Sequence, residues 1–543
     1  MTIKTQDWVH FFPFKAPRAE QEQAINFALN SFVEGKRHVV LSCGTGVGKS
    51  AIGVTIARWL ESNMPEAPGS GYTPGAYFLT TQKILQEQYM RDFSQTMRQV
   101  MSSANYNCKF QRGQSCAEGQ RMLKVVSDKS SPFFRSCAYN CVYKEEKRKF
   151  LEASESVTNF SYFMAETNYS GKLTPRSLLV VDEAHNAELE LSKFIEIIVS
   201  EKFSTQVLKL DFPDAKTQKQ AWTWIQEVYE PKLKSHVKHH EKMVEQLGLG
   251  DKIKNDFIQI SRQYEMLDKH LCKLHRFMEL YDEDNWVFNT VDAQRQAMRK
   301  FEFKPVDVAG YSESMLFKNG RRTLMMSATI LNYDAHKEML GLKDEESAFM
   351  EIPSPFPIDN RPIFQFMIGN MSHGEIDRTL PKLAEAVKGI LENHANEKGV
   401  IHCHSYKIVN YIKKNVKSKR LLTHESHDRD EVLKKHLSSK MPTVLLSPSM
   451  TEGVDLRDDA SRFQVICKVP YPYLGDKLVT KKMHKWKWWY PLQTAKVIVQ
   501  SVGRSVRSET DHAVTYILDS NWGYFYSKHS EIFPKDFRAC LKK

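Results

Sequence analysis

The sequence contains no long apolar run, no internal repeat and no extended low-complexity tract. Nowhere do about 18 apolar residues follow one another, so we expect no transmembrane helix and no membrane partner. The first residues, Met1–Thr5, lack the apolar core of a signal peptide, which favours a cytoplasmic protein, or one in the host cytoplasm if a phage encodes it. In such a reducing compartment, the nine cysteines are not expected to form a disulfide framework.

The size and charge of the chain indicate several globular domains and a polyanionic partner. Its 543 residues exceed one ordinary core, and a hydrophobic fraction of 41% is enough to build more than one. The 77 Lys and Arg residues outnumber the 65 Asp and Glu residues and leave a net charge of +12. This excess favours binding to nucleic acid, although unrelated soluble proteins often have a similar charge. We expect a monomer.

A glycine-rich segment, Cys43-Gly-Thr-Gly-Val-Gly-Lys-Ser50, stands between an apolar strand pattern at 39–42 and a helical pattern at 50–60. This order of strand, loop and helix is typical of a P-loop, in which glycines let the backbone approach phosphate closely. Lys49 would contact the β- and γ-phosphates of ATP, and Ser50 would bind Mg²⁺. A merely flexible glycine loop is the alternative, and the flanking elements argue against it. The expected nucleotide-binding residues here are Thr45, Gly46, Gly48, Lys49 and Ser50.

An acidic pair follows the apolar strand pattern at 177–181, where the sequence continues as Asp182-Glu-Ala-His185. Carboxylates at the carboxyl end of a strand can reach the metal ion and the attacking water of a bound nucleotide. Asp182 would then hold Mg²⁺, and Glu183 would orient or deprotonate the water. A lone acidic pair often only ends a strand in solvent, but the P-loop upstream favours the catalytic interpretation.

The order of the strand patterns predicts an α/β fold with two domains built on parallel sheets. Strands are expected in the first domain at 39–42, 76–80, 177–181 and 323–326, and in the second at 399–403, 444–446 and 465–469. Two insertions interrupt the first domain. Residues 105–150 carry clustered cysteines, whereas residues 190–300 contain few Gly or Pro and show a helical pattern.

Four of the nine cysteines are clustered, with the spacing Cys108-x7-Cys116-x20-Cys137-x3-Cys141. Four thiolates suit either an iron-sulfur cluster or Zn²⁺, and the spacing alone does not decide between them. Four other cysteines have no partner at ligand spacing, and we expect them to be packing residues: Cys272, Cys403, Cys467 and Cys540.

Several segments resemble the motifs of superfamily 2 helicases. The box 182–185 with Asn186 resembles motif II, Ser327-Ala-Thr329 resembles motif III, and Gln500-Ser-Val-Gly-Arg-Ser-Val-Arg507 resembles motif VI. Further segments are similar to the XPD/DinG branch of this superfamily and extend over most of the chain. They are Arg18–Gln21, Thr158–Tyr162, Pro305–Asp307, Ser354–Pro357, Ser405–Tyr406, Glu452–Asp455 and Pro470–Tyr473.

The resemblance implies two RecA-like P-loop motor domains, with an iron-sulfur cluster insertion and a helical arch insertion in the first. The first motor would comprise residues 1–104, 151–189 and 301–330, the cluster domain 105–150, the arch 190–300 and the second motor 331–543. The implied cofactors are ATP, Mg²⁺ and a 4Fe-4S cluster. The position of the cysteines between the P-loop and the acidic box favours this cluster, with the ligands Cys108, Cys116, Cys137 and Cys141.

The resemblance also assigns roles around the nucleotide. Gln21 would contact the base region, and Glu452 and Asp455 would couple the second motor to nucleotide and DNA. Arg504 and Arg507 are three residues apart and therefore expected on one helical face, from which they could reach the γ-phosphate as arginine fingers. A surface ion-pair face is the alternative for the two arginines. Gln500 completes the expected catalytic set.

The implied activity is that of an ATP-dependent DNA helicase that moves 5′ to 3′ on single-stranded DNA and unwinds forked duplex DNA. An ATPase that remodels RNA or protein–DNA complexes without unwinding has the same motor motifs and is the main alternative. A helicase fused to a nuclease would need a further carboxylate-rich domain, which we do not find in the sequence. A zinc-containing DNA-binding protein without enzyme activity would not need the complete ATPase set.

The stretch Lys481–Tyr490 interleaves basic and aromatic residues. This composition is typical of surfaces that bind single strands through phosphate contacts and base stacking. The aromatic residues could equally belong to the core and begin the helix that carries motif VI, so both interpretations stay open.

Overall fold

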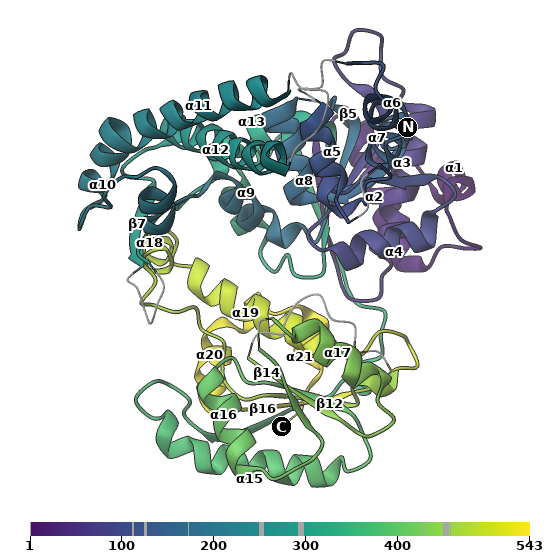
Figure 1. The fold of residues 1–543 in the computed structure, drawn as a ribbon. Helices are drawn as coiled ribbons and strands as arrows, with labels where there is room; N and C mark the ends of the chain where they lie inside the picture. The colour runs from purple at the N-terminus through teal and green to yellow at the C-terminus, as the bar shows by residue number, and fades with distance from the viewer. Residues whose placement is uncertain are drawn as a thin grey trace.

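The computed structural model describes residues 2–110, 113–123, 128–171, 173–248, 255–291, 298–425, 427–448, 456 and 458–542. Two α/β domains lie one above the other in Figure 1, with the N-terminal domain (purple to teal) above the C-terminal domain (green to yellow). Two long helices lie side by side at the edge of the upper domain. Within the described ranges, no helix is long and apolar enough to cross a membrane.

A seven-stranded parallel sheet forms the centre of the first domain, with the strand order β10-β1-β9-β5-β2-β4-β3. Its strands β1 and β5 are buried along their whole length, as expected for a parallel sheet covered on both faces. Val40 faces one core and its neighbours Val39 and Leu41 face the other. The four strands predicted for this domain are confirmed. The seven strands are β1 (His38–Cys43), β2 (Thr73–Thr80), β3 (Met97–Gln99), β4 (Glu155–Asn159), β5 (Arg176–Asp182), β9 (Gly320–Ser327) and β10 (Ser347–Ile352).

Helices of the first domain pack against this sheet and place its loops. The helices that matter for the site are α2 (Ala19–Val33), α3 (Lys49–Asn63), α4 (Lys83–Phe93) and α9 (Ala187–Ile195). Helix α3 starts directly after the glycine-rich loop, as the sequence predicts. Its buried residues include Ile52, Val54 and Ile56, which pack with β1 in one apolar core. Helices α8 (Phe160–Ala165), α13 (Ala309–Met315) and α14 (Tyr333–Leu340) complete the domain.

The second domain also contains a seven-stranded parallel sheet, ordered β13-β14-β12-β15-β16-β11-β17. Its strands are β11 (Ile363–Gly369), β12 (Gly399–His402), β13 (Leu421–Thr423), β14 (Val444–Ser447), β15 (Phe463–Ile466), β16 (Val514–Asp519) and β17 (Leu541–Lys542). The three strands predicted here are present, although β15 ends earlier than expected. The helices are α15 (Ile376–Asn393), α16 (Tyr406–Asn415), α17 (Arg429–Ser438), α18 (Lys477–Lys485), α19 (Trp489–Val502), α20 (Asn521–His529) and α21 (Lys535–Ala539).

The boundary between the two domains lies later in the chain than predicted. Strand β10 pairs with β1 and therefore belongs to the first sheet, whereas the second sheet starts with β11 at Ile363. The boundary predicted at residue 331 would assign β10 to the wrong domain. The chain crosses between the domains at residues 353–362, where prolines occupy positions 353, 355 and 357 and a short 3-10 helix follows at Ile358–Asn360.

The two insertions of the first domain contact each other. The cysteine module contains α5 (Cys116–Leu123), α6 (Pro132–Tyr139) and α7 (Val142–Glu152). Met122 and Phe133 of this module pack against Val244 of α11 (Glu230–Gly248) and Phe257 of α12 (Asn255–Leu280). An ion pair of 2.8 Å between Arg262 and Glu118 adds to this contact. The cysteine module and the long helices are therefore packed against each other as well as joined to the first domain.

The helical insertion carries a small sheet that the sequence analysis did not predict. Helices α10 (Gln218–Trp224), α11 and α12 confirm its helical character. Strands β6 (Ile197–Ser200), β7 (Trp286–Val291) and β8 (Lys300–Pro305) form an antiparallel sheet ordered β6-β8-β7 at its base. Phe277 of α12 packs on Trp286 and Phe303, so the sheet fixes the long helices to the first domain.

Candidate active site

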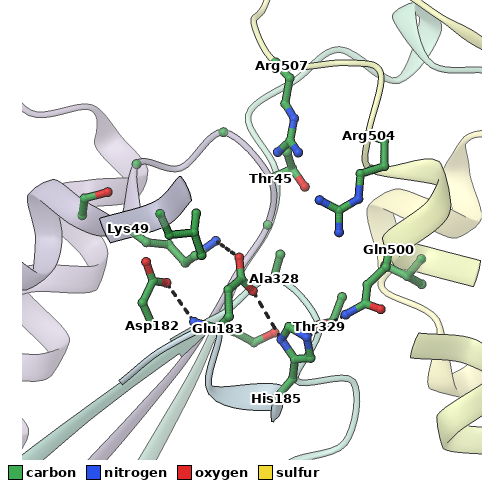
Figure 2. Close-up of a pocket in the computed structure, with 18 of the residues that line it drawn as sticks. Thr45, Lys49, Asp182, Glu183, His185, Ala328, Thr329, Gln500, Arg504 and Arg507 are labelled. Carbon is green, nitrogen blue, oxygen red and sulfur yellow. Dashed lines mark hydrogen bonds and ion pairs between the residues drawn. The ribbon is translucent and has the colours of Figure 1, made fainter. Parts of the chain in front are cut away.

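A cavity of about 840 Å³ lies between the two domains and is lined by residues of both. Figure 2 shows the first domain supplying the P-loop and the acidic pair, while the second domain supplies Gln500 and two arginines. Ten of the predicted site residues line this cavity: Thr45, Gly46, Gly48, Lys49, Ser50, Asp182, Glu183, Gln500, Arg504 and Arg507. Segments more than 300 residues apart in the sequence are thus brought together.

The P-loop has the geometry of an anion-binding turn. Strand β1 ends at Cys43, the backbone is left-handed at Gly46 (φ 92°) and Gly48 (φ 87°), and helix α3 begins at Lys49. The first amides of α3 therefore point into the cavity, where a helix N-terminus favours negative charge. The loop is held from outside by Arg18, which donates a 2.7 Å hydrogen bond to the Gly46 carbonyl.

Asp182 and Glu183 occupy the carboxyl end of the central strand β5. The backbone of Glu183 is left-handed (φ 51°), a strained conformation for a residue other than glycine, and its amide donates to Asp182 Oδ1 at 2.9 Å. Lys49 Nζ lies 3.7 Å from Glu183 Oε1. The turn thus directs the Glu183 carboxylate towards the P-loop lysine.

Burial and charge act in opposite directions on these carboxylates. Burial raises the pKa of Asp182 above its usual range, despite the nearby Lys49. Burial also tends to raise the pKa of Glu183, but Lys49 and His185 outweigh it, so the net pKa of Glu183 is below its usual value. Glu183 is therefore ionised at neutral pH and can orient a water molecule through its carboxylate.

Tyr89 of α4 is a site residue that the sequence analysis missed. Its side chain is buried, and its hydroxyl donates to Asp182 Oδ2 at 3.1 Å and also contacts Ser50. Burial raises the pKa of Tyr89 well above its usual value, so the phenol stays a hydrogen-bond donor. An aromatic residue on a helix normally indicates core packing, and the sequence carries no signal for a contact across 93 positions.

A hydrogen-bond network joins the acidic box to the second domain. His185 Nδ1 lies 2.7 Å from Ser327 Oγ and 3.3 Å from Glu183 Oε2. The backbone amide of Thr329 donates to the same Ser327 hydroxyl at 3.1 Å. On the other edge of the imidazole, the amide of Gln500 donates to His185 Nε2 at 2.7 Å. Ser327 of motif III and Gln500 of the second domain thus both contact His185 of the acidic box.

The two arginines line the cavity, but not from one helical face as predicted. Helix α19 ends at Val502, so Arg504 and Arg507 lie in the loop that follows it. Gly503 ends the helix, so the two arginines are held by contacts outside it. The amide of Arg507 donates to the buried carboxylate of Asp511 at 3.0 Å, and Asp511 also pairs with Arg462. Figure 2 shows both guanidinium groups on the side of the cavity that faces Thr45 and Glu183.

Of the other residues predicted near the nucleotide, Gln21 does not line the cavity. Gln21 lies behind the P-loop: its amide is 3.5 Å from the Gly48 carbonyl, and its side-chain oxygen accepts from the Arg18 amide at 2.9 Å. In this position Gln21 supports the loop, and its contact with the base stays a prediction. Glu452 and Asp455 lie outside the described residues.

The four clustered cysteines converge in the module on the first domain. A Cβ added to Gly119 would lie 3.4 Å from the sulfur of Cys137 and 3.6 Å from that of Cys108, so the two sulfurs flank this glycine. Gln120 Nε2 lies 3.4 Å from the sulfur of Cys141. Cys116 is buried in the same module. Within the described residues, no group of three or more His, Cys, Asp or Glu side chains is arranged to hold a metal ion.

The thiols of this group interact with one another. A hydrogen bond from Cys137 lowers the pKa of Cys141 to about 5 and raises the pKa of Cys137 itself. Burial raises the pKa of Cys116 to about 11, and the neighbouring Cys141 contributes to this rise. Cys403, Cys467 and Cys540 are buried, as predicted for packing residues. Cys272 is exposed, contrary to the same prediction.

The basic and aromatic stretch at 481–490 forms an inter-domain contact. Lys482 of α18 pairs with Glu188 of α9 at 2.5 Å, and Lys481 donates to the Trp286 carbonyl at 3.1 Å. Trp486 and Trp489 are buried with Met339 of α14 in a small apolar cluster. Much of this stretch therefore joins the second domain to the first, and the core interpretation holds for its buried tryptophans.

Comparisons with known proteins agree with this architecture. Residues 390–539 match the model of the helicase C-terminal domain, and residues 14–212 match that of the type III restriction enzyme res subunit. A solved XPD helicase superposes with a TM-score of 0.63 at 14% identity, covering 96% of this chain and 99% of the other. In its motifs and fold, the chain is similar to superfamily 2 helicases of the XPD/DinG branch. The S. tokodaii Xpd4 structure gives a TM-score of 0.57 at 15% identity, covering 97% and 99% of the two chains.

Curated relatives of this chain match over shorter segments. A probable ATP-dependent helicase of Methanocaldococcus jannaschii is 27% identical over 222 residues, which cover 36% of this chain and 34% of the relative. The ATP-dependent DNA helicase YoaA of Escherichia coli is 22% identical over 228 residues, covering 40% and 36%. A regulator of telomere elongation helicase 1 homolog of Caenorhabditis briggsae is 26% identical over 110 residues, covering 17% and 11%. The match thus spans about a third or less of the length of these relatives. The two α/β domains are RecA-like motor domains.

Proposed function

We propose that the chain is an ATP-dependent DNA helicase that binds single-stranded and forked duplex DNA and moves 5′ to 3′ along the single strand. One observation carries the proposal: a single cavity combines the P-loop and acidic pair of the first motor with Gln500, Arg504 and Arg507 of the second. A nucleotide bound there would be held by both motors. Its hydrolysis would then change how the motors contact each other.

Each group of residues in the cavity would have a separate role in ATP hydrolysis. Lys49 and the first amides of α3 would neutralise the phosphates, and the Glu183 carboxylate would orient the attacking water. Arg504 and Arg507 would stabilise the charge that develops on the transferred phosphoryl group. All these groups line the same cavity, which supports this division of roles.

Ser50 and Asp182 fit the role of magnesium ligands. Both are oxygen donors next to the P-loop, and the Tyr89 hydroxyl contacts both of them, so they lie side by side. Oxygen ligands of this kind are those that Mg²⁺ prefers. When bound, Mg²⁺ would neutralise charge on the phosphates. Tyr89 would fix the orientation of the Asp182 carboxylate.

The cysteine module holds a 4Fe-4S cluster in this proposal. Support comes from the donor set, since the thiols of Cys108, Cys137 and Cys141 lie around Gly119 and Gln120 and Cys116 interacts with Cys141. It also comes from their position in an insertion between the P-loop and the acidic box. The module also packs against the arch through Met122 and Phe133. A cluster bound by Cys108, Cys116, Cys137 and Cys141 would brace the module beside the proposed DNA path.

The test compares ATP turnover with and without single-stranded DNA, and then strand displacement on a forked duplex. A DNA helicase shows turnover that DNA stimulates and unwinding that requires ATP. Stimulation by RNA alone, or stimulation by DNA without any unwinding, would instead support the remodelling ATPase. An absence of ATP turnover under all these conditions would exclude both.

A further inference from the structure

The segment 353–362 joins the two motors and is tied to the catalytic loops at both ends. At its start, the hydroxyl of Ser354 donates to the Thr45 carbonyl in the P-loop at 2.7 Å. Near its end, the side-chain amide of Asn360 donates to the Glu509 carbonyl at 2.9 Å, and its own carbonyl accepts from the Ala513 amide at 2.9 Å. The linker thus connects the P-loop with the loop that carries the two arginines.

Phe356 lies in the middle of this linker and contacts both loops. A Cβ added to Gly46 would lie 2.0 Å from Phe356 Cζ, so the ring rests directly on the P-loop backbone. In the second motor, the ring packs with Val506 and Ala513 in a small apolar cluster. Val506 stands between Arg504 and Arg507 in the sequence. Phe356 is only 4% exposed, and it also lines the cavity between the two motors.

We infer that Phe356 is a positioning residue that couples the state of the P-loop to the placement of the arginine pair. The inference rests on the proposed ATPase function. A close-packed ring transmits displacement, because its neighbours on both sides are in van der Waals contact with it. A shift of Gly46 when phosphate binds moves the ring, and the ring moves Val506 with the two arginines beside it. The hydrogen bond from Ser354 to Thr45 adds a second, directional link in the same segment.

The first experiment separates nucleotide binding from turnover in Phe356→Leu. We expect the kcat of DNA-stimulated ATP hydrolysis to fall about 10-fold, because the arginines are no longer placed, while the Kd of a fluorescent ATP analogue with Mg²⁺ stays within about 2-fold. Phe349→Leu is the matched control. Phe349 is a partly buried phenylalanine of β10 that stacks on Tyr333 and does not line the cavity. Wild-type kcat in Phe356→Leu would overturn the inference, and so would a loss explained entirely by weaker nucleotide binding.

The second experiment measures the coupling itself by hydrogen exchange and mass spectrometry. In the wild type, a non-hydrolysable ATP analogue should protect both residues 43–50 and residues 499–513. In Phe356→Leu we expect protection of the first segment to persist and protection of the second to be lost. If Phe356 only stabilised the fold, its replacement would weaken the protection of both segments. If both segments stayed protected in the variant, the coupling role would be excluded.

A third variant covers the case in which thermal melting shows that Phe356→Leu does not fold. Ser354→Ala removes one hydroxyl and leaves the apolar contacts intact, and we expect about a 3-fold lower kcat at unchanged nucleotide affinity. Wild-type kcat in this variant would then reject the inference. If the wild-type chain itself does not hydrolyse ATP, the proposed function fails. Normal wild-type turnover with unaffected linker variants rejects the coupling role alone.

Discussion

The imidazole of His185 in the first motor accepts a 2.7 Å hydrogen bond from the amide of Gln500 in the second. The other ring nitrogen of His185 lies 3.3 Å from the Glu183 carboxylate. One imidazole therefore connects the second motor to Glu183, the residue proposed to orient the attacking water. We expect a change in the spacing of the two motors to reach the Glu183 carboxylate through this ring.

Gln500→Ala should remove the hydrogen bond between Gln500 and His185 and so uncouple the two motors. We expect kcat for ATP hydrolysis to fall about 10-fold or more with little change in KM, because misplacement of a catalytic group affects turnover more than ground-state binding. The control is Gln493→Ala, which changes the same residue type two turns earlier on α19. Steady-state kinetics check the split, and an effect confined to KM would contradict the proposed role.

Lys49→Ala and Glu183→Gln should each abolish most of the ATPase activity. Lys49 would hold the transferring phosphate and Glu183 would position the water, so each loss should lower turnover at least about 100-fold. Phosphate release with and without single-stranded DNA measures the effect. Near-normal turnover in both variants would mean that the cavity is not the hydrolysis site.

Tyr89→Phe should change the response to Mg²⁺. Only the hydroxyl that contacts Asp182 and Ser50 is removed, so the Mg²⁺ concentration for half-maximal hydrolysis should rise about 3- to 10-fold, the effect of one lost buried hydrogen bond. The affinity for a fluorescent ATP analogue should fall in Mg²⁺ but not in EDTA. Tyr77→Phe is the control, since Tyr77 is equally buried but donates to the Thr174 carbonyl at 3.0 Å. Equal effects of the two substitutions would exclude a specific role for Tyr89.

The cysteine module should contain iron. Protein purified without oxygen is expected to be brown and to contain about four iron and four sulfide per chain, the stoichiometry of a 4Fe-4S cubane. Cys108→Ser, Cys116→Ser, Cys137→Ser and Cys141→Ser should each lose the colour and reduce unwinding more than basal ATP hydrolysis, because the ATP cavity is built from the motors. Cys272→Ser, at an exposed position, is the control. Zinc in a colourless wild-type protein would contradict the prediction.

Where the residues are contiguous, the sequence predicts well which of them come together in the cavity. The P-loop and the acidic box are short segments flanked by strand and helix patterns, and Lys49, Ser50, Asp182 and Glu183 all line the cavity as expected. Spacing was misleading for the arginine pair, because an interval of three residues suggests one helical face only while the helix continues. Helix α19 stops at Val502, before the first arginine.

Other features depend on contacts that local sequence does not encode. Tyr89 meets Asp182 only because α4 packs beside β5, and Phe356 meets Gly46 only because the linker folds over the P-loop. Strand β8 did carry a usable signal, since Phe301, Phe303 and Pro305 alternate with polar residues and are buried at every second position. The predicted domain boundaries place these residues in the first motor domain, just after the helical insertion, and assign no strand to them.

The direction of movement is the prediction that depends most on the insertions. Helicases of both polarities share the P-loop, the acidic box and the arginine pair, so 5′ to 3′ movement is expected from the resemblance to the XPD/DinG branch. The cysteine module contacts the arch where Met122 and Phe133 pack with Val244 and Phe257. If the first motor and these two insertions surround the DNA strand, as the resemblance implies, the strand must be threaded from a free single-stranded tail, so we expect loading from one kind of tail only.

Matched duplexes with either a 5′ or a 3′ tail, supplied with ATP and Mg²⁺, test this direction. We expect unwinding of the 5′-tailed duplex and little of the 3′-tailed one. Binding should weaken steeply as salt rises, because a backbone-tracking path relies on phosphate contacts and shows little sequence preference. Preferential unwinding of the 3′-tailed duplex would reverse the assigned polarity, but it would leave the ATPase site standing, because the cavity residues are the same for either direction of travel.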